Sequence, residues 1–309
     1  MTTLLLTHPS ALNHDTGLGH PERPDRIRAL NEEFGKEKYS MLAREEAPLA
    51  PLEAVGLAHP MEYAEKLREI VPAQGAVRVD GDTVLSAKSW EPIMRAVGGA
   101  IYAVDEVFAK KASNAFVAMR PPGHHCETAT PMGFCFFNNA AIAARHAQKN
   151  HGAERVAIID FDVHHGNGTQ DIFWADPSVL YSSTHQMPLY PGTGAKSETG
   201  AANTIVNAPL SSGDGGAQFK EAFETVILPR INNFQPDLLV ISAGFDAHRN
   251  DPLASLNLVE EDFAWVTGKL MDLADKHANG RVVSLLEGGY DLEGLARSAG
   301  AHVRTLMRA

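Results

Sequence analysis

The sequence predicts an α/β fold: one domain with a mainly parallel central sheet that is flanked by helices on both faces. Short apolar runs alternate along the chain with longer amphipathic segments, as strands alternate with crossover helices. Polar clusters follow five of the apolar runs, and open α/β sheets build their sites beyond the carboxyl ends of the strands. No repeat, low-complexity tract or Ser/Gly linker divides residues 1–309. We therefore expect the polar clusters to converge on one edge of a single sheet.

The expected elements follow in chain order. Six apolar runs are predicted to be strands: Leu4–Thr7, Ala115–Met119, Arg155–Asp160, Val179–Ser183, Leu238–Ser242 and Val282–Leu286. Six amphipathic segments are predicted to be helices: Pro24–Glu33, Trp90–Lys111, Asn138–Asn150, Ala217–Phe234, Val259–His277 and Leu292–Leu306. Stretches rich in Gly and Pro, such as "RPPGHH" and "YPGTG", are expected to be loops between these elements.

Composition and charge exclude several functional classes. The chain is 44% hydrophobic, which is enough for a large core, and its formal net charge of −11 disfavours a nucleic acid as the main partner. No apolar stretch is long enough to span a bilayer, and "MTTLLLTHPS" lacks the basic region of a signal peptide. Cys126 and Cys135 make no disulfide framework and are expected to be small buried hydrophobic residues. We expect a cytoplasmic protein, and a homo-oligomer stays open.

The stretch "RVAIIDFDVHHGNGTQ", residues 155–170, ends a predicted buried strand in groups that are costly to bury. If the extended chain persists, Asp160, Asp162 and His164 project from the same side. Asp246 in "SAGFDAH" comes from another strand end and would close a set with Asp162 and His164. Three protein ligands with an open fourth position describe a catalytic zinc site. Oxygen and nitrogen donors without thiolate select zinc weakly, so Fe²⁺ and Co²⁺ stay open.

The charge of this ligand set constrains the chemistry. Two carboxylates cancel the double charge of the ion, which becomes a milder Lewis acid than a three-histidine zinc. Such a site needs a separate base and a separate oxyanion donor. His124 and His125, adjacent in a Gly/Pro loop, are candidates for the base, and Tyr290 after "EGG" is the candidate donor.

With "RPPGHH", "DFDVHHGNGTQ", "YPGTG", "SAGFDAH" and "EGGY" in this order, the sequence resembles the zinc-dependent histone deacetylase superfamily. That superfamily includes acetoin-utilization proteins and acetylpolyamine amidohydrolases. The resemblance runs from "GHPERPDRIRAL" to "EGGYDLEGLARS", and Asn167 with "DAHRNDPLASL" looks closer to the class II-like branch and its bacterial relatives. It implies an arginase/deacetylase-like fold and metal-dependent hydrolysis of an acylated amine.

The resemblance also implies roles for the catalytic residues. His125 matches the general base toward the water on the metal, which then acts as acid toward the leaving amine, and His124 matches its electrostatic partner. Tyr290 matches the phenol that donates to the substrate carbonyl and the oxyanion. Class I members carry an aspartate where this chain has Asn167, so His125 should be less basic and neutral at pH 7. The metal ligands implied are Asp162, His164 and Asp246.

Further residues are implied around this centre. Gly133, Phe134 and Tyr190 fall where the family lines a narrow tunnel for the aliphatic stem of a lysine. Potassium beside the zinc would use Asp160, the Ser183 hydroxyl and backbone carbonyls that include that of His164. Arg26 follows "HPERP" and would by default form a surface salt bridge, but it matches an arginine of the family's inner acetate-exit cavity.

The sequence is compatible with more than one class of substrate. An N6-acetyl-lysine side chain on a protein or peptide is the simplest substrate, and an acetylated polyamine or other small acyl-amine is the rival. Leu253 weakly favours the lysine-like substrate, whereas a carboxylate from another loop at the mouth, such as Asp82, would reverse that preference. A binuclear manganese ureohydrolase lacks ligands for its second ion here. A non-enzymatic acyl-lysine binder is the alternative outside the enzymes.

Overall fold

The computed structural model describes residues 2–309, and its centre is a parallel eight-stranded sheet. The strand order is β2-β1-β5-β10-β9-β6-β7-β8, and every pair of neighbours is parallel. The strands are β1 (Thr3–Thr7), β2 (Ala43–Glu46), β5 (Asn114–Val117), β6 (Val156–Asp160), β7 (Val179–Gln186), β8 (Ile205–Leu210), β9 (Leu238–Ala243) and β10 (Val282–Leu286). A separate antiparallel pair consists of β3 (Ala76–Arg78) and β4 (Val84–Ser86).

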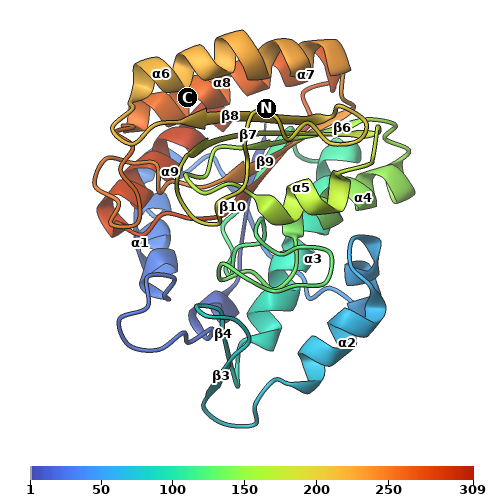
Figure 1. Ribbon diagram of the computed structural model, residues 1–309. Helices are drawn as coiled ribbons and strands as arrows, with labels where there is room; N and C mark the ends of the chain where they lie inside the picture. The colour runs from blue at the N-terminus through green and yellow to red at the C-terminus, as the bar shows by residue number, and fades with distance from the viewer. Residues whose placement is uncertain (1) are drawn as a thin grey trace.

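Helices cover both faces of the sheet, as Figure 1 shows. One face carries α3 (Trp90–Phe108), α4 (Asn139–His151) and α5 (Asn167–Phe173). The other carries α6 (Gly216–Ala222), α7 (Leu228–Phe234) and α8 (Glu260–His277), and α9 (Leu292–Leu306) packs between α8 and α1 (Asp25–Phe34). The remaining helix is α2 (Met61–Glu69). No helix within residues 2–309 is both long and apolar enough to cross a membrane.

The predicted fold class is confirmed, and the central strands show why the sequence could predict it. Every residue of β5, β6, β9 and β10 is buried, because helices cover both faces of these strands. Strands of this kind read as continuous apolar runs rather than as alternating ones. All six predicted strands are present, and the bounds of the last one are those predicted.

The differences lie at the edges of the sheet, at a helix interruption, and in α2, α5, β3 and β4, which were not predicted. The edge strand β2 reads "AREE" and is mostly exposed, so it carries no apolar run to detect. The other edge strand, β8, reads "IVNAPL", and Asn207 and Pro209 interrupt its apolar run. The helix predicted over Ala217–Phe234 is α6, a π-helical turn (Phe223–Ile227) and α7 in succession. Such a turn adds a residue to the helical repeat without breaking the apolar pattern.

The strand order explains where a site can form. The four central strands β5, β10, β9 and β6 are neighbours in the sheet, although they come from distant parts of the chain. Their registers align Val117 with Leu285, Leu285 with Ser242, and Ser242 with Asp160. The carboxyl ends of all four strands therefore reach the same edge of the sheet, and the polar loops that follow them meet there.

Candidate active site

Three of the predicted residues form a compact group of metal-ligating atoms. Nδ1 of His164 lies 3.1 Å from Oδ1 of Asp162 and 3.1 Å from Oδ2 of Asp246. All three side chains are buried, and one ligand atom of each lies within 4.8 Å of the others. We call these residues the strand-end cluster. The loop after β6 supplies Asp162 and His164, and the loop after β9 supplies Asp246, as the spacing predicted.

Backbone amides hold the two carboxylates of the strand-end cluster in place. Asp162 Oδ2 accepts a hydrogen bond from the Gly288 amide at 2.8 Å, and Asp246 Oδ1 accepts one from the Val163 amide at 2.9 Å. A side chain at Gly288 would overlap both carboxylates, so the "EGGY" turn can approach the cluster this closely only with glycine there. The turn after β10 and the cluster therefore fix each other.

The strand-end cluster fits a divalent cation. Burial and the neighbouring Asp162 carboxylate raise the pKa of Asp246 to about 7, so the two buried carboxylates need positive charge between them. One imidazole and two carboxylates suit Zn²⁺, Fe²⁺ or Co²⁺, and three ligands leave a position open, as in catalytic sites. The donor set therefore supports the predicted metal site without selecting the ion.

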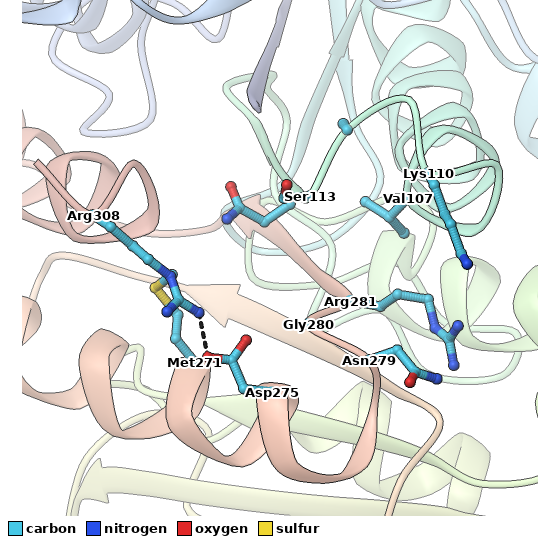
Figure 2. Close-up of a pocket in the computed structure, with 11 residues that line it drawn as sticks. Val107, Lys110, Ser113, Met271, Asp275, Asn279, Gly280, Arg281 and Arg308 are labelled. Atoms are coloured by element: carbon cyan, nitrogen blue, oxygen red, sulfur yellow. Dashed lines mark hydrogen bonds and ion pairs between the residues drawn. The ribbon is translucent and has the colours of Figure 1, made fainter. Parts of the chain in front are cut away.

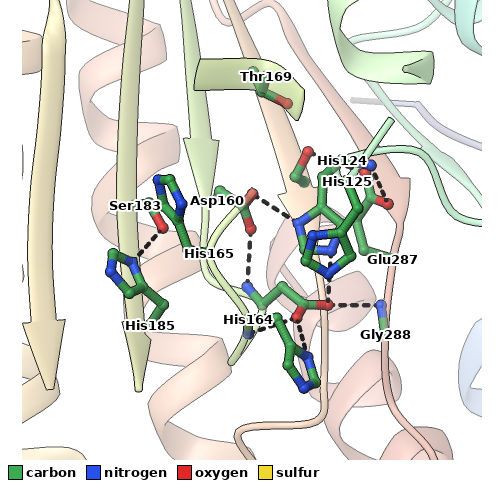
Figure 3. Close-up of polar contacts among 12 residues, drawn as sticks. His124, His125, Asp160, His164, His165, Thr169, Ser183, His185, Glu287 and Gly288 are labelled. Carbon is green, nitrogen blue, oxygen red and sulfur yellow. Dashed lines mark hydrogen bonds and ion pairs between the residues drawn. The ribbon is translucent and has the colours of Figure 1, made fainter. Parts of the chain in front are cut away.

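His124 and His125 are adjacent in sequence but have different partners; Figure 3 shows both histidines with Asp160, the partner of His124. His124 Nδ1 donates to Asp160 Oδ2 at 3.0 Å, whereas His125 Nδ1 lies 2.8 Å from Asn167 Oδ1. The Asn167 amide nitrogen donates to Glu127, so its oxygen faces His125 and Nδ1 of His125 carries the proton. The lone pair of His125 is then on Nε2, the nitrogen that a general base needs free.

The two histidines also differ in their pKa values. Burial opposes the charged form of His124, but the carboxylates of Asp160 and Asp162 outweigh it and raise its pKa well above the usual value. Burial holds the pKa of His125 well below its usual value, and the positive charges of His124 and His164 act in the same direction. At neutral pH the pair therefore consists of a charged His124 and a neutral His125.

Tyr290 lies on the turn after β10, and a buried carboxylate holds that turn. Asp251 Oδ2 accepts hydrogen bonds from the amides of Tyr290 at 2.7 Å and Asp291 at 3.2 Å. Oδ1 of the same Asp251 accepts one from the Leu253 amide at 3.0 Å. Burial raises the pKa of Tyr290 well above its usual value, so its hydroxyl keeps its proton at neutral pH and can donate a hydrogen bond.

A cavity of about 260 Å³ opens onto these groups. Its lining consists of Pro21, Asp82, His125, Gly133, Phe134, His164, Leu189, Tyr190, Leu253 and Tyr290. The structure thus brings every predicted tunnel residue to the same cavity as His125, His164 and Tyr290. Phe134 and Tyr290 meet edge to face at 5.9 Å, and Tyr190 meets His125 at 5.1 Å. A side chain at Gly133 would come within 2.5 Å of the His125 ring, so glycine keeps this wall open.

Arg26 is wholly buried behind Tyr290 and does not form the surface salt bridge that its sequence context suggests. Its guanidinium lies 4.9 Å from the centre of the Tyr290 ring and donates to the Glu287 and Gly289 carbonyl oxygens at 2.5 and 2.6 Å. Glu22 pairs with it at 3.2 Å. Arg26 is therefore directed inward, and its role in an inner acetate-exit cavity stays a prediction.

Asp160 and Ser183 lie side by side at the ends of β6 and β7, where the sheet register pairs them. Asp160 Oδ2 also accepts from the Tyr181 hydroxyl at 3.1 Å. Ser183 Oγ contacts His185 Nδ1 at 2.8 Å, as Figure 3 shows. Asp160 therefore supports His124 and is not part of the strand-end cluster. Its position one strand from Ser183 is compatible with the predicted potassium site.

Sequence reasoning missed several buried charged groups of the site. Glu287 Oε2 accepts from the Gly123 and His124 amides at 2.7 and 3.2 Å and so fixes the "RPPGHH" loop. Arg120 makes a bidentate ion pair with the Glu22 carboxylate, and both contacts are 2.6 Å long. The only available signal was a charged residue directly after an apolar strand, which holds for both Arg120 and Glu287.

A larger hollow of about 460 Å³ lies at the opposite edge of the sheet, near the amino ends of β5 and β10, and Figure 2 shows its lining. Basic side chains of Lys110, Arg281 and Arg308 surround it, and Arg308 pairs there with Asp275. None of the predicted site residues lines this hollow. Size alone therefore does not identify the site; the convergence of titratable groups does.

Comparisons with known proteins identify the family of this chain. Residues 20–306 match the family model of the histone deacetylase domain. A probable deacetylase of Archaeoglobus fulgidus is 41% identical over 303 residues, which cover 95% of this chain and 83% of that protein. A histone deacetylase-like amidohydrolase of Pseudomonas aeruginosa is 39% identical over 279 residues, covering 88% and 73%. The crystal structure of the HDA15 HD domain superposes with a TM-score of 0.93 at 34% identity, covering 99% of this chain and 90% of that one.

Proposed function

Because the chain belongs to the histone deacetylase domain family, we propose that it hydrolyses the amide bond of an acylated amine, most simply an N6-acetyl-lysine side chain. The observation that carries this proposal is a single cavity that has apolar walls and ends at His125, His164 and Tyr290. Phe134 and Tyr190 would hold the aliphatic stem of the substrate, and Gly133 leaves space for it beside His125. The scissile amide would then lie at the strand-end cluster.

Asp162, His164 and Asp246 would hold the metal, which we propose to be Zn²⁺, with Fe²⁺ or Co²⁺ as alternatives. When bound, the ion would polarise the substrate carbonyl and make a water molecule more acidic. We further propose a structural K⁺ near Asp160 and Ser183, which the sheet register pairs.

The side chains around the cluster would carry out the proton transfers. Neutral His125 takes the proton of the attacking water at Nε2, because Asn167 occupies Nδ1. Tyr290 donates its hydroxyl hydrogen to the carbonyl oxygen as negative charge develops there. Charged His124 adds a fixed positive charge beside the same atoms. His125 then returns its proton to the leaving amine.

The test is an assay of the purified protein on a fluorogenic acetyl-lysine amide, with and without a chelator. We expect hydrolysis that a chelator abolishes and that added Zn²⁺, Fe²⁺ or Co²⁺ restores. Turnover that survives complete removal of metal would contradict the proposed mechanism. Binding of the acetyl-lysine peptide without any hydrolysis by the metal-loaded protein would favour the non-enzymatic binder.

Asp82 gives a specific reason to keep acetylated polyamines as a second substrate class. Asp82 lines the same cavity as Leu253, and its carboxylate would attract the cationic far end of a polyamine. Our first choice remains acetyl-lysine peptides, which should be hydrolysed at least as well as acetylated polyamines. A kcat/KM that favours the polyamine tenfold, about 1.4 kcal/mol, would reverse this ranking. In that case Asp82→Asn should remove the preference, whereas Asp80→Asn serves as the matched control.

A further inference from the structure

A second group of metal-ligating side chains lies where α3 and α4 end, on the face of the sheet that these helices cover. Asp105 comes from the last turn of α3, and His146 and His151 come from the last two turns of α4. Nε2 of each histidine lies 2.6 Å from the same carboxylate oxygen, Oδ1 of Asp105. The three atoms lie within 4.8 Å of one another. We call this group the helix-end cluster.

Neighbouring side chains orient both imidazoles of the helix-end cluster. The Asn150 side-chain amide contacts Nδ1 of His146 at 2.9 Å, one turn further along α4. The ring of Phe108 stacks on that of His151, with centroids 4.7 Å apart and planes inclined by 17°. Metal-ligating histidines have this arrangement, in which one nitrogen faces the ion and other groups fix the ring. The two histidines are thus held with their Nε2 atoms directed at one point.

The electrostatic surroundings favour a cation at that point. Both helices present their carboxyl ends to the helix-end cluster, and a helix carries partial negative charge at this end. Asp105 adds a full negative charge, while its side chain is 44% exposed and that of His151 is 23% exposed. Water can therefore reach the cluster and complete the coordination of a bound ion.

We propose that the helix-end cluster is a second metal site that binds one Zn²⁺-like ion through Asp105, His146 and His151. Two imidazoles and a carboxylate suit Zn²⁺, Cu²⁺ and Ni²⁺ and are poor ligands for Mg²⁺. Zinc bonds of about 2.0–2.2 Å place neighbouring ligand atoms about 3.3 Å apart, so each histidine nitrogen moves less than about 1 Å from its present contact.

Binding of the ion requires a rearrangement of protons that the surroundings allow. Each Nε2 must lose its hydrogen, and the neutral imidazole then carries it on Nδ1. For His146 this Nδ1–H needs an acceptor, and Asn150 supplies one by turning its amide so that the oxygen faces the ring. The ion would join α3 to α4 and stabilise the folded protein without touching the cavity of the active site.

The test measures metal binding in a protein whose strand-end cluster is disabled, so it does not depend on activity. The background is Asp162→Ala combined with His164→Ala, and the probe is ZnCl₂ titrated into the metal-free protein in a calorimeter. We expect one equivalent to bind, and His151→Asn in this background should weaken that binding at least tenfold. His277→Asn, which removes a histidine from the end of α8, is the matched control and should leave binding unchanged.

A second measurement covers the case in which the background variant fails to fold. Zinc-loaded wild-type protein should contain two equivalents per chain after gel filtration, and His151→Asn should contain one, with kcat/KM on acetyl-lysine amide within twofold of wild type. Asn150→Ala should weaken the second site about tenfold, as loss of an orienting partner usually does.

Three results would overturn the proposal. A folded background variant that binds no zinc would show that the helix-end cluster holds no metal, as would a single equivalent in wild-type protein that His151→Asn retains. Zinc that still binds with unchanged affinity after His151→Asn would lie elsewhere. Loss of catalysis with the second equivalent intact would instead count against the proposed function, so the two failures are distinguishable.

Discussion

The strand-end cluster and the helix-end cluster have similar ligands and different surroundings. Each gathers three imidazole and carboxylate groups within 4.8 Å. The first is buried and lies at one cavity with a further histidine, His125, and with Tyr290, whereas the second has an exposed carboxylate at the ends of two helices. The comparison teaches that three ligands suffice for a candidate metal site, whereas catalysis of hydrolysis also needs a base and an oxyanion donor beside the ligands, each with a suitable pKa.

The largest expected effect is the loss of catalysis when the strand-end cluster is broken. Asp162→Ala removes one of three ligands and leaves His164 without one of its two carboxylate partners. We expect no detectable turnover and no metal at this cluster, because three ligands leave no redundancy. Metal content and kcat measured on the same sample check this. Near-stoichiometric metal at the cluster together with normal turnover would refute the ligand assignment.

Tyr290→Phe should separate metal binding from oxyanion stabilisation. The substitution removes one hydroxyl and leaves the ring against Phe134 and the ligands in place. We expect kcat to fall about 10²–10³-fold, the usual cost of one oxyanion donor, with metal content and KM nearly unchanged. If turnover stays near that of wild type, Tyr290 is not directed at the substrate carbonyl.

The third prediction concerns pH and rests on the neutral partner of His125. Burial and nearby positive charge lower the pKa of His125, so the free base is present at neutral pH and kcat/KM falls only when the pH drops through that lowered pKa. Asn167→Asp places a negative charge at the ring and favours the imidazolium, which raises the pKa of His125. The acidic limb of the pH–rate profile should therefore move to higher pH. An unmoved limb would mean that another group controls it.

The smallest expected effect is on activity when the helix-end cluster is changed. Asp105→Asn leaves the strand-end cluster and its cavity intact, so kcat/KM in the presence of saturating metal should stay within twofold of wild type. The thermal midpoint without added metal should change little, since Asp105 is 44% exposed and a pair of this kind contributes about 0–1 kcal/mol. A large loss of kcat would show that the two clusters are coupled and not independent.

The same comparison explains what the sequence could predict. Asp162, His164 and Asp246 follow buried strands, and parallel strands bring their carboxyl ends together whatever the details of packing. Asp105, His146 and His151 lie on two helices, and only the angle and register at which α3 and α4 pack bring them together. No periodicity in the sequence reports that angle. The edge strand β2 was missed for a related reason, since an exposed strand needs no apolar run.

The site also contains groups that no local pattern singles out. Arg26 looked like a surface residue because its helix begins in a polar loop, yet it is buried behind Tyr290. Its partners are carbonyl oxygens more than 260 positions along the chain, at Glu287 and Gly289. Contacts between residues this far apart in the sequence form only when the sheet is complete. The resemblance to a known family predicted an inward position for Arg26, whereas local reasoning predicted a surface position; its role in an acetate-exit cavity stays a prediction.

The position of β10 has a consequence for the order in which the protein becomes active during synthesis. This strand is the last of the sheet to leave the ribosome, yet it inserts between β5 and β9 at the centre. Until it arrives, both neighbours expose unpaired edges, and the turn with Gly288 and Tyr290 cannot reach the strand-end cluster. A nascent chain that ends before residue 282 should therefore be inactive and should depend on chaperones that shield the open edges from other chains.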